Sequence, residues 1–285
     1  MRMTPVATGY LSRPFYYYAL PETMKMRFRT THAATLTLCF ANALLAGCGG
    51  GGSGDPAATA AAVTYPSAEG VYIGNIARGT SSEFQALVLP NGDMWSLYGY
   101  DSGSAFYVDG FAQGNGSSTN GTFTATLKDF GYLPAIPGTM TATYNLTDKT
   151  IGGTSTYMGR TFAFGGGPAP ESFYLFDTPA LVRDVVGQWN TMSTEGGLVS
   201  VNITANGAVT LSEESCAGTG TIAPHASGKN VFDISVTFGP APCFIPNATV
   251  TGIVMSYPLA TGQRQLIAAV TNQARTAGIA VFGIR

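Results

Sequence analysis

The chain has 285 residues, of which 45% are hydrophobic and only 11% are charged, and its formal net charge is −2 at pH 7. Ordinary soluble domains carry about a quarter charged residues, so Ser, Thr, Asn, Gln and Gly must supply most of the polar surface. No basic cluster occurs after residue 47, which argues against a nucleic-acid partner because phosphates require a basic footprint. The 37 glycines, with frequent β-branched and aromatic residues, are typical of an exported all-β protein with many tight turns.

The first predicted element is a signal peptide that ends before residue 48. Residues 25–29 are rich in Lys and Arg, residues 33–45 are mostly apolar, and the run closes in Leu45-Ala46-Gly47-Cys48. The apolar run is shorter than the ~20 residues of a membrane-spanning helix, and the glycines that follow it cannot continue a helix. The sequence therefore predicts that residues 1–47 are a signal peptide region and are removed.

Residues 1–23 add an aromatic stretch ahead of a signal that is already complete. We therefore expect translation to begin at Met24 or Met26. Removal of residues 1–47 takes away five of the 14 basic and one of the 16 acidic side chains, which leaves a net charge near −6. The predicted mature chain is thus clearly acidic.

The tetrapeptide Leu45-Ala46-Gly47-Cys48 resembles the lipobox of bacterial lipoproteins at every position. This resemblance implies a diacylglycerol thioether on Cys48 and a fatty acyl group such as palmitate on the new amino terminus. Several acyl chains together supply the stable membrane anchoring that one chain does not. Gly49, rather than Asp, after the cysteine implies by the same resemblance that the protein is sorted to the outer membrane.

Residues 48–65 are rich in Gly and then in Ala, which predicts a flexible tether. Beyond it, period-two alternation of apolar and polar residues returns between Gly, Asn, Asp and Pro breaks and predicts strands. We expect eight strands in an N-terminal β module, residues 66–166, and eight in a C-terminal β module, residues 187–285. Short antiparallel strands bury an apolar face most simply by closing on themselves. The sequence therefore predicts two antiparallel, eight-stranded, barrel-like modules.

The segment between the modules, residues 167–186, is predicted to be a linker. The run from Gly165 to Pro170 combines three glycines with two prolines, which indicates a hinge. Thr178-Pro179 fits the first two positions of a short helical turn that reaches Val182.

A weak internal repeat relates the two modules. Gly70-Val71-Tyr72 lies 21 residues before Asn91, and Gly187-Gln188-Trp189 lies 19 residues before Asn206. Each asparagine is followed by glycine between two apolar runs, which is the strongest short-range signal for a hairpin with positive φ values. The same arrangement of a strand and a hairpin is therefore expected to open both modules.

The four cysteines differ in their expected fate. Cys39 leaves with the signal peptide and Cys48 takes the lipid, so Cys216 and Cys243 remain as a pair outside the cytoplasm, where a disulfide is expected. The rival interpretation, half of a metal site, lacks further ligands because His225 is the one histidine of the mature chain. We therefore predict a disulfide, no metal site and no cofactor.

Gly187-x-Trp189 at the start of an up-and-down barrel resembles the opening motif of lipocalins and avidins. In those families the tryptophan packs across one end of the barrel beneath a late arginine. The resemblance implies that Arg275 or Arg285 takes this place by cation–π stacking. It does not extend to small-ligand binding, since the first module has Tyr72 at the matching position.

The whole layout also resembles uncharacterised Gly/Thr-rich outer-membrane lipoproteins of Gram-negative bacteria. The resemblance covers most of residues 68–285, including both late cysteines, the turn Ser227-Gly228-Lys229-Asn230 and Val231–Phe238. More distantly, the architecture is similar to factor H binding protein and to the lipoprotein subunit of the transferrin receptor. These resemblances imply display at the membrane and binding of a protein partner.

Candidate partner sites are aromatic. The segment from Phe130 to Pro137 is an unusually apolar loop, and exposed apolar patches often mark partner sites; its candidate contact residues are Phe130, Tyr132, Leu133 and Ile136. The alternative is that this loop folds over an open barrel end. Residues 94–111 carry aromatic side chains on both faces of a predicted hairpin, so some of them should lie between the modules or meet a partner.

Catalytic signals are weak. A Ser-His-acid arrangement would have to use His225, which lies in a turn-like segment, and no Gly-x-Ser-x-Gly elbow occurs. We therefore predict a non-enzymatic, lipid-anchored outer-membrane or surface lipoprotein that acts as a protein- or envelope-binding module. The alternatives are an inhibitor of lysozymes or proteases and, less favoured, an integral outer-membrane barrel of sixteen strands.

Overall fold

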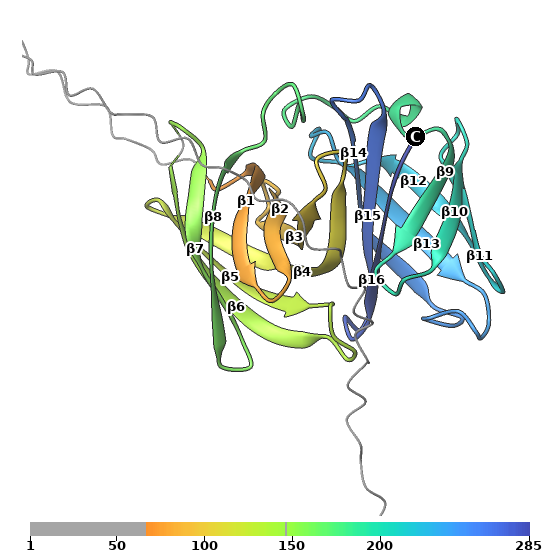
Figure 1. Cartoon of the computed structure of the whole chain (residues 1–285), viewed down its shortest axis with the longest axis horizontal. Coiled ribbons are helices and arrows are strands. Elements are labelled where there is room, and N and C mark those ends of the chain that lie inside the picture. Colours follow the sequence, from red (N-terminus) through yellow and green to blue (C-terminus); the bar gives the residue numbers. More distant parts are fainter. Residues whose placement is uncertain (1–66, 146) are drawn as a thin grey trace, which may run out of the picture. The chain divides into compact units, whose positions relative to one another are not determined.

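The computed structural model describes residues 67–145 and 147–285, so the predicted signal peptide, lipobox and tether lie outside the described residues. In the described part, strands β1–β8 pair in sequence order into one closed antiparallel barrel, and β9–β16 form a second (Figure 1). The predicted fold class is therefore confirmed. The alternative of a single sixteen-stranded barrel is wrong, because β1 pairs with β8 and β9 pairs with β16.

The first barrel consists of β1 (Gly70–Arg78), β2 (Ser81–Val88), β3 (Asp93–Asp101), β4 (Phe106–Thr119), β5 (Thr122–Asp129), β6 (Ile136–Asn145), β7 (Thr150–Tyr157) and β8 (Arg160–Pro168). The second consists of β9 (Gly187–Ser193), β10 (Leu198–Ile203), β11 (Ala208–Glu213), β12 (Cys216–Pro224), β13 (Phe232–Phe238), β14 (Thr249–Pro258), β15 (Arg264–Asn272) and β16 (Gly278–Ile284).

Alternation along each strand sorts side chains between the barrel interior and the outside. In β13, Phe232 and Val236 are buried inside the barrel, whereas Asp233 and Thr237 face outward. The two interiors are filled by separate apolar clusters, which leave cavities of only about 30 and 50 Å3. Sites for small molecules usually measure about 300–1,000 Å3. Each barrel is therefore a packed core rather than a container.

Strand β8 contains the glycines that the sequence predicts to be a hinge, so that prediction is wrong. Gly165, Gly166 and Gly167 pair with β1 and close the first barrel. A Cβ atom on Gly166 would lie 2.4 Å from the carbonyl oxygen of Ile73, and one on Gly74 would lie 2.2 Å from that of Gly165. Glycine is required here because the two backbones approach too closely for a side chain.

The predicted helical turn begins later than expected. The segment before the second barrel contains a 3-10 helix, η1, at Val182–Asp184, and Leu181 before it has an extended backbone. Thr178-Pro179 therefore does not start a helix.

The internal repeat is confirmed in detail. Tyr72 and Trp189 are both buried, and each donates a hydrogen bond to the carbonyl oxygen four residues earlier, at 3.0 Å to Ala68 and at 2.8 Å to Val185. The Asn-Gly hairpins then join β2 to β3 and β10 to β11 with matching backbone hydrogen bonds. Only the glycine of each pair has a positive φ, which corrects the expectation that both residues would.

The predicted disulfide is present between Cys216 and Cys243, whose Cα atoms lie 4.8 Å apart. Cys216 opens β12, and Cys243 lies in the loop between β13 and β14. Because adjacent antiparallel strands run in opposite directions, the start of β12 and the end of β13 lie at the same end of the barrel.

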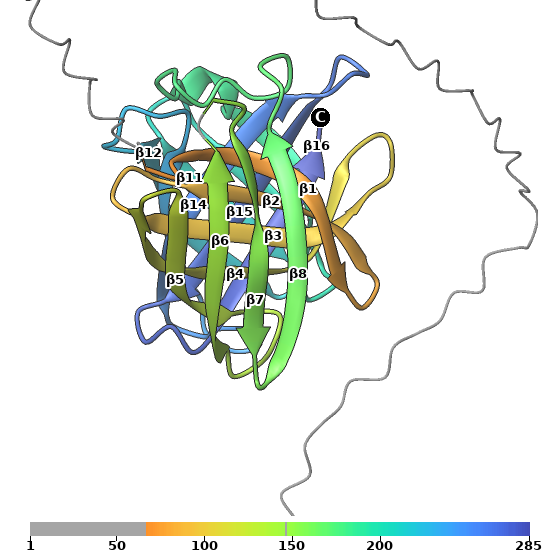
Figure 2. The same cartoon turned by 90° about the vertical axis from the view of Figure 1, so that its left-hand side faces the viewer.

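The two barrels belong to one compact unit and share a third apolar cluster, which we call the junction core. It joins outward-facing side chains of β2–β4 to those of β14–β16, whereas β5–β8 form the wall of the first barrel that faces the viewer in Figure 2. Trp95 and Phe111 from the aromatic hairpin stack within the junction core, with ring centroids 6.0 Å apart. The expectation that some of these aromatic residues lie between the modules is confirmed.

The hydrogen bonds of a buried glutamine fix how the two barrels align at the junction. Gln265 is fully buried, its Oε1 accepts the backbone N–H of Phe106 at 3.0 Å, and its Nε2 donates to the Phe106 carbonyl oxygen at 2.6 Å. The Tyr257 hydroxyl also lies 3.0 Å from the same Oε1. These bonds leave one favoured register between the barrels, because a shift would expose unpaired buried polar groups.

Candidate binding groove between the barrels

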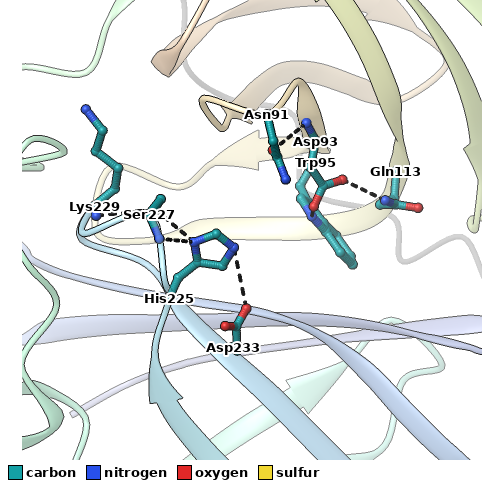
Figure 3. Close-up of polar contacts among 8 residues, drawn as sticks. All are labelled: Asn91, Asp93, Trp95, Gln113, His225, Ser227, Lys229 and Asp233. Carbon is teal, nitrogen blue, oxygen red and sulfur yellow. Dashed lines mark hydrogen bonds and ion pairs between the residues drawn. The ribbon is translucent and has the colours of Figure 1, made fainter.

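A groove of about 620 Å3 follows one margin of the junction core. Its walls come from β3 and β4 of the first barrel and from β12–β15 of the second. This volume lies within the usual range of small-molecule sites. Figure 3 shows the polar groups on both walls, one set on each barrel.

The second barrel contributes a row of hydroxyl groups. Thr221, Ser235, Thr251 and Thr271 are register partners on four neighbouring strands, and all four line the groove. Neighbouring strands are about 4.7–4.9 Å apart. Regular alternation therefore places hydroxyls side by side across the sheet, each able both to donate and to accept a hydrogen bond.

The first barrel contributes a carboxylate and an amide. Asp93 accepts hydrogen bonds from the Trp95 indole N–H at 3.1 Å and from Gln113 Nε2 at 2.8 Å. A carboxylate can only accept, so this contact fixes which side of the Gln113 amide carries the nitrogen. Gln113 Oε1 is then buried with no hydrogen-bond partner among the described residues.

Arg275 lies where the groove meets the turn between β15 and β16. Its Nη2 donates to the Gln113 carbonyl oxygen at 2.7 Å, and its own carbonyl accepts from Lys128 Nζ at 2.8 Å. Its Nε atom is buried and has no partner within the described part of the chain. The groove is thus lined by two residues that carry one unused acceptor and one unused donor.

His225 lies on the other wall, next to a serine and an aspartate. Its Nδ1 lies 2.8 Å from Ser227 Oγ and accepts the Ser227 backbone N–H at 3.0 Å, while its Nε2 lies 3.7 Å from Asp233 Oδ1 (Figure 3). A ring nitrogen that accepts an N–H bond carries no proton itself. The neutral ring therefore has its proton on Nε2, on the side of Asp233.

This arrangement does not provide an activated serine. In a catalytic triad the base takes the serine proton while an acid orients the opposite nitrogen by a hydrogen bond. Here the Nδ1 lone pair is already shared with the backbone of Ser227, and Asp233 lies beyond hydrogen-bond distance of Nε2. The three side chains form a polar wall rather than a nucleophilic centre.

The loop residues singled out from the sequence lie elsewhere. Phe130 is buried in the junction core and stacks on Phe111 at 5.0 Å, so it holds the barrels together. Tyr132 and Leu133 are 51% and 60% exposed, whereas Ile136 is partly buried as the first residue of β6. The loop is thus divided between a packed part and an exposed tip.

A charged cluster lies at the same end of the first barrel, and no sequence motif marks it. Arg78 forms an ion pair with the fully buried Asp129, and its guanidinium lies 3.9 Å from the ring centroid of Tyr98 and 5.3 Å from that of Tyr157. Burial and the Asp129 charge hold the pKa of Tyr98 well above its usual range. Burial lowers the pKa of Arg78, but the charges of Tyr98 and Asp129 outweigh this effect, so its pKa is raised.

The predicted stacking of a late arginine on Trp189 is confirmed. The Arg285 guanidinium lies 4.1 Å from the ring centroid of Trp189, so Arg285 rather than Arg275 takes the predicted place. Its Nη1 also donates to the carbonyl oxygen of Val186. This pair closes one end of the second barrel.

Sequence reasoning missed the groove as a whole. Asp93 and Gln113 are separated by more than 100 residues from His225 and Arg275, and only the packing of the two barrels brings them together. The hydroxyl row could have been predicted from the sequence, because Thr and Ser recur on the polar positions of the predicted strands. Residues 67–145 and 147–285 include no helix that could span a membrane and no group of three potential metal-ligating side chains.

No family model and no curated protein sequence matches the chain. Comparison with solved structures finds a protein of unknown function from the DUF3598 family of Nostoc punctiforme. It is 10% identical, with a TM-score of 0.23, and the match covers 76% of this chain and 94% of that chain.

Proposed function

We propose that this protein is a non-enzymatic lipoprotein of the outer membrane, anchored by acyl chains on Cys48, whose two-barrel body binds a protein or a component of the cell envelope. The observation that carries the binding role is the open polar groove between two packed barrels. The anchoring part follows from the resemblance of residues 45–48 to a lipobox.

Binding outside the barrels is favoured because the interiors are occupied by the chain's own side chains. The groove, in contrast, offers open space and polar groups that are not all used within the protein. Since His225 and Ser227 do not form an activated nucleophile, binding explains this site better than hydrolysis does.

The outer faces of the strands support a body that lies beside the membrane. The outward residues of β6 include Thr139, Thr141 and Thr143, all of them exposed. Barrels that cross a bilayer carry an apolar band on the outside instead. A tether of residues 48–65 would reach about 25 Å on average, which keeps such a body close to the membrane surface.

Anchoring is tested by exchanging Cys48 for serine in the full-length gene. We expect the wild-type protein to sediment with outer membranes and to need detergent for release, and the C48S variant to lose this behaviour. Protease treatment of intact cells then places the body: its release indicates surface display, and its protection indicates the periplasmic face. Wild-type protein that needs no detergent would contradict the anchor.

An inhibitor of lysozymes or proteases is the second candidate. The observation that favours it is the exposed tip of the loop after β5, where Tyr132 and Leu133 project from a base held by the buried Phe130. Inhibition of a panel of purified lysozymes and proteases, abolished by Leu133→Asp, would support this role. Absence of inhibition across the panel would leave the groove as the binding site.

A further inference from the structure

We propose that the groove between the barrels binds a neutral oligosaccharide. This inference deepens the proposed binding role and rests on it, because it names the class of ligand for the same groove. Four features of the groove decide the class: its charge, its row of hydroxyls, its unused donor and acceptor, and the pairing of its strands.

Charge disfavours anionic ligands. The carboxylates of Asp93 and Asp233 line the groove on opposite barrels, against the single permanent cation of Arg275 within this lining. Arg275 is already engaged through Nη2 with the backbone of Gln113. A phosphate or a carboxylate ligand would meet two like charges against one guanidinium, and repulsion of this kind costs affinity for the wrong ligand.

Polarity disfavours apolar ligands. Most residues that line the groove carry a polar group, among them Thr, Ser, Asn, Gln, Asp, His and Arg, although carbon atoms make up the larger part of the exposed lining surface. The apolar aromatic ring of the lining is committed to the junction core. This ring, Trp95, is 5% exposed and stacks on Phe111. An acyl chain placed here would strip water from polar groups without replacing their hydrogen bonds, which is unfavourable.

The hydroxyl row favours a ligand that alternates donors and acceptors. Thr221 and Thr251 are exposed and Ser235 is partly exposed, so these side chains remain available to a ligand. Sugar hydroxyls can both give and take hydrogen bonds, as can the hydroxyls of the row. The several hydroxyls of one pyranose ring can therefore engage side chains on more than one strand.

The unused polar atoms at one end of the groove fit a hydroxyl as well. Gln113 Oε1 requires a donor and Arg275 Nε requires an acceptor, and each atom is buried without a partner in the described chain. Leaving such groups unpaired costs about 1–3 kcal/mol each. A hydroxyl can donate to the first or accept from the second, whereas a carbonyl can only accept and an ammonium group can only donate.

Strand pairing disfavours an extended peptide. Peptides often bind by adding a strand to a free sheet edge. Each strand that lines the groove already pairs with a neighbour on both sides, because both barrels are closed. A peptide would therefore have to bind by its side chains alone.

The test uses the full-length protein as purified from cells. The probes are maltotriose, cellotriose and the trimer of N-acetylglucosamine, with inositol hexakisphosphate as the anionic comparison, and binding is followed by titration calorimetry and by the NMR signals of the two indole N–H groups. Trp95 donates to Asp93 in the groove, whereas Trp189 donates to Val185 inside the second barrel, so the latter is an internal control. We expect at least one neutral trisaccharide to bind saturably and to shift the Trp95 signal alone.

The matched variants separate the groove from the general surface. The double variant Thr221→Val and Thr251→Val removes two exposed hydroxyls from the groove while preserving side-chain shape, and we expect the Kd to rise about fivefold or more. The control, Thr141→Val and Thr143→Val, makes the same exchange at two exposed positions on the outer wall of β6, and we expect its Kd to stay within about twofold of wild type.

Three results would overturn the proposal: no binding of any neutral probe, binding that leaves Trp95 unchanged, or preferential binding of the anionic probe with a Trp95 shift. An equal loss of affinity in both double variants would also reject the groove as the site. Because membrane fractionation of the C48S variant does not depend on sugar binding, a failed titration with intact anchoring would reject the ligand class and leave the lipoprotein role standing.

Discussion

Arg78 and Asp129 form the charged pair whose loss should cost most in the first barrel. Asp129 is fully buried, and Arg78 is nearly so and is surrounded by aromatic rings. Removing Arg78 leaves the buried Asp129 without its counter-charge, held by hydrogen bonds from the Tyr98 hydroxyl and the Gly131 N–H. Breaking a buried ion pair in this way typically costs about 3–5 kcal/mol. We therefore expect Arg78→Met to lower the free energy of unfolding by this amount in urea denaturation at pH 7.

The matched control is Arg160→Met, which removes an exposed arginine at the start of β8. We expect its effect on the free energy of unfolding to stay within about 0.5 kcal/mol. Equal losses from the two exchanges would show that the buried pair contributes nothing beyond ordinary surface charge.

Buried tyrosines predict a loss of stability at alkaline pH. Burial raises the pKa of Tyr72 to about 12 and also raises the pKa values of Tyr157, Tyr174 and Tyr257. The same side chains ionise near pH 10 in the unfolded chain. Above pH 10 the folded state therefore binds more protons than the unfolded state, so the free energy of unfolding falls by up to about 1.4 kcal/mol per pH unit for each tyrosine.

Urea midpoints measured between pH 9 and about pH 11.5 test this expectation. Tyr72→Phe should make the decline of stability with pH shallower, because the variant has lost one group that ionises only on unfolding. Tyr132→Phe, at an exposed position, should leave the slope unchanged. A stability that does not change across this range would refute the expectation.

The repeated hairpins require glycine for two separable reasons. Gly207 and Gly262 follow the same turn pattern and have φ values of 80° and 82°. A Cβ on Gly207 would lie 2.3 Å from the carbonyl oxygen of Ile222, whereas nothing lies within 4 Å of one on Gly262. We expect Gly262→Ala to cost about 1 kcal/mol for the left-handed backbone.

Gly207→Ala should cost about 1–3 kcal/mol more than this, because the neighbouring strand must also move. Thermal unfolding of both variants measures the difference. If the two exchanges lower the free energy of unfolding equally, the close approach of β12 to the hairpin does not add to the cost of the Gly207 exchange.

Short-range patterns explain why the strands and hairpins were predictable. Alternation in β13 and the Asn-Gly turns act within one strand or between sequence neighbours, so the sequence alone indicates them. Gly165–Gly167 were misassigned because glycine marks both hinges and close strand contacts, and only pairing with β1 distinguishes the two. The role of Phe130 was left open for a related reason, since an apolar loop residue can face a partner or pack within its own chain, as Phe130 does in the junction core.

The junction between the barrels was beyond short-range patterns. It depends on outward-facing apolar residues of β2–β4 meeting those of β14–β16, and no periodicity specifies which outer faces meet. The groove could not be predicted from periodicity either, because it forms along the margin of the junction core. The candidate binding site was therefore the least predictable part of the molecule, although the residue types that line it were visible.

The shared junction core predicts that both barrels unfold together. We expect one calorimetric transition for the wild-type protein, because separating the barrels exposes apolar side chains from each of them. Gln265→Leu leaves the backbone N–H and C=O of Phe106 unpaired at this junction. We expect it to lower the free energy of unfolding by about 2–4 kcal/mol.

Gln263→Leu provides the comparison, since Gln263 is exposed in the neighbouring turn and should have little effect. Two well-separated transitions in the wild-type protein, or equal Tm values for the two leucine variants, would show that the barrels are energetically independent.

The lipid anchor decides whether this two-barrel body works at a membrane. The most direct measurement is mass spectrometry of the amino-terminal peptide of the full-length gene product, isolated from a Gram-negative host. Lipid attachment predicts that the chain begins at Cys48 and that this residue carries the mass of a diacylglycerol group and an amide-linked acyl chain. A different first residue, or a Cys48 whose sulfur carries no lipid, would contradict the proposal.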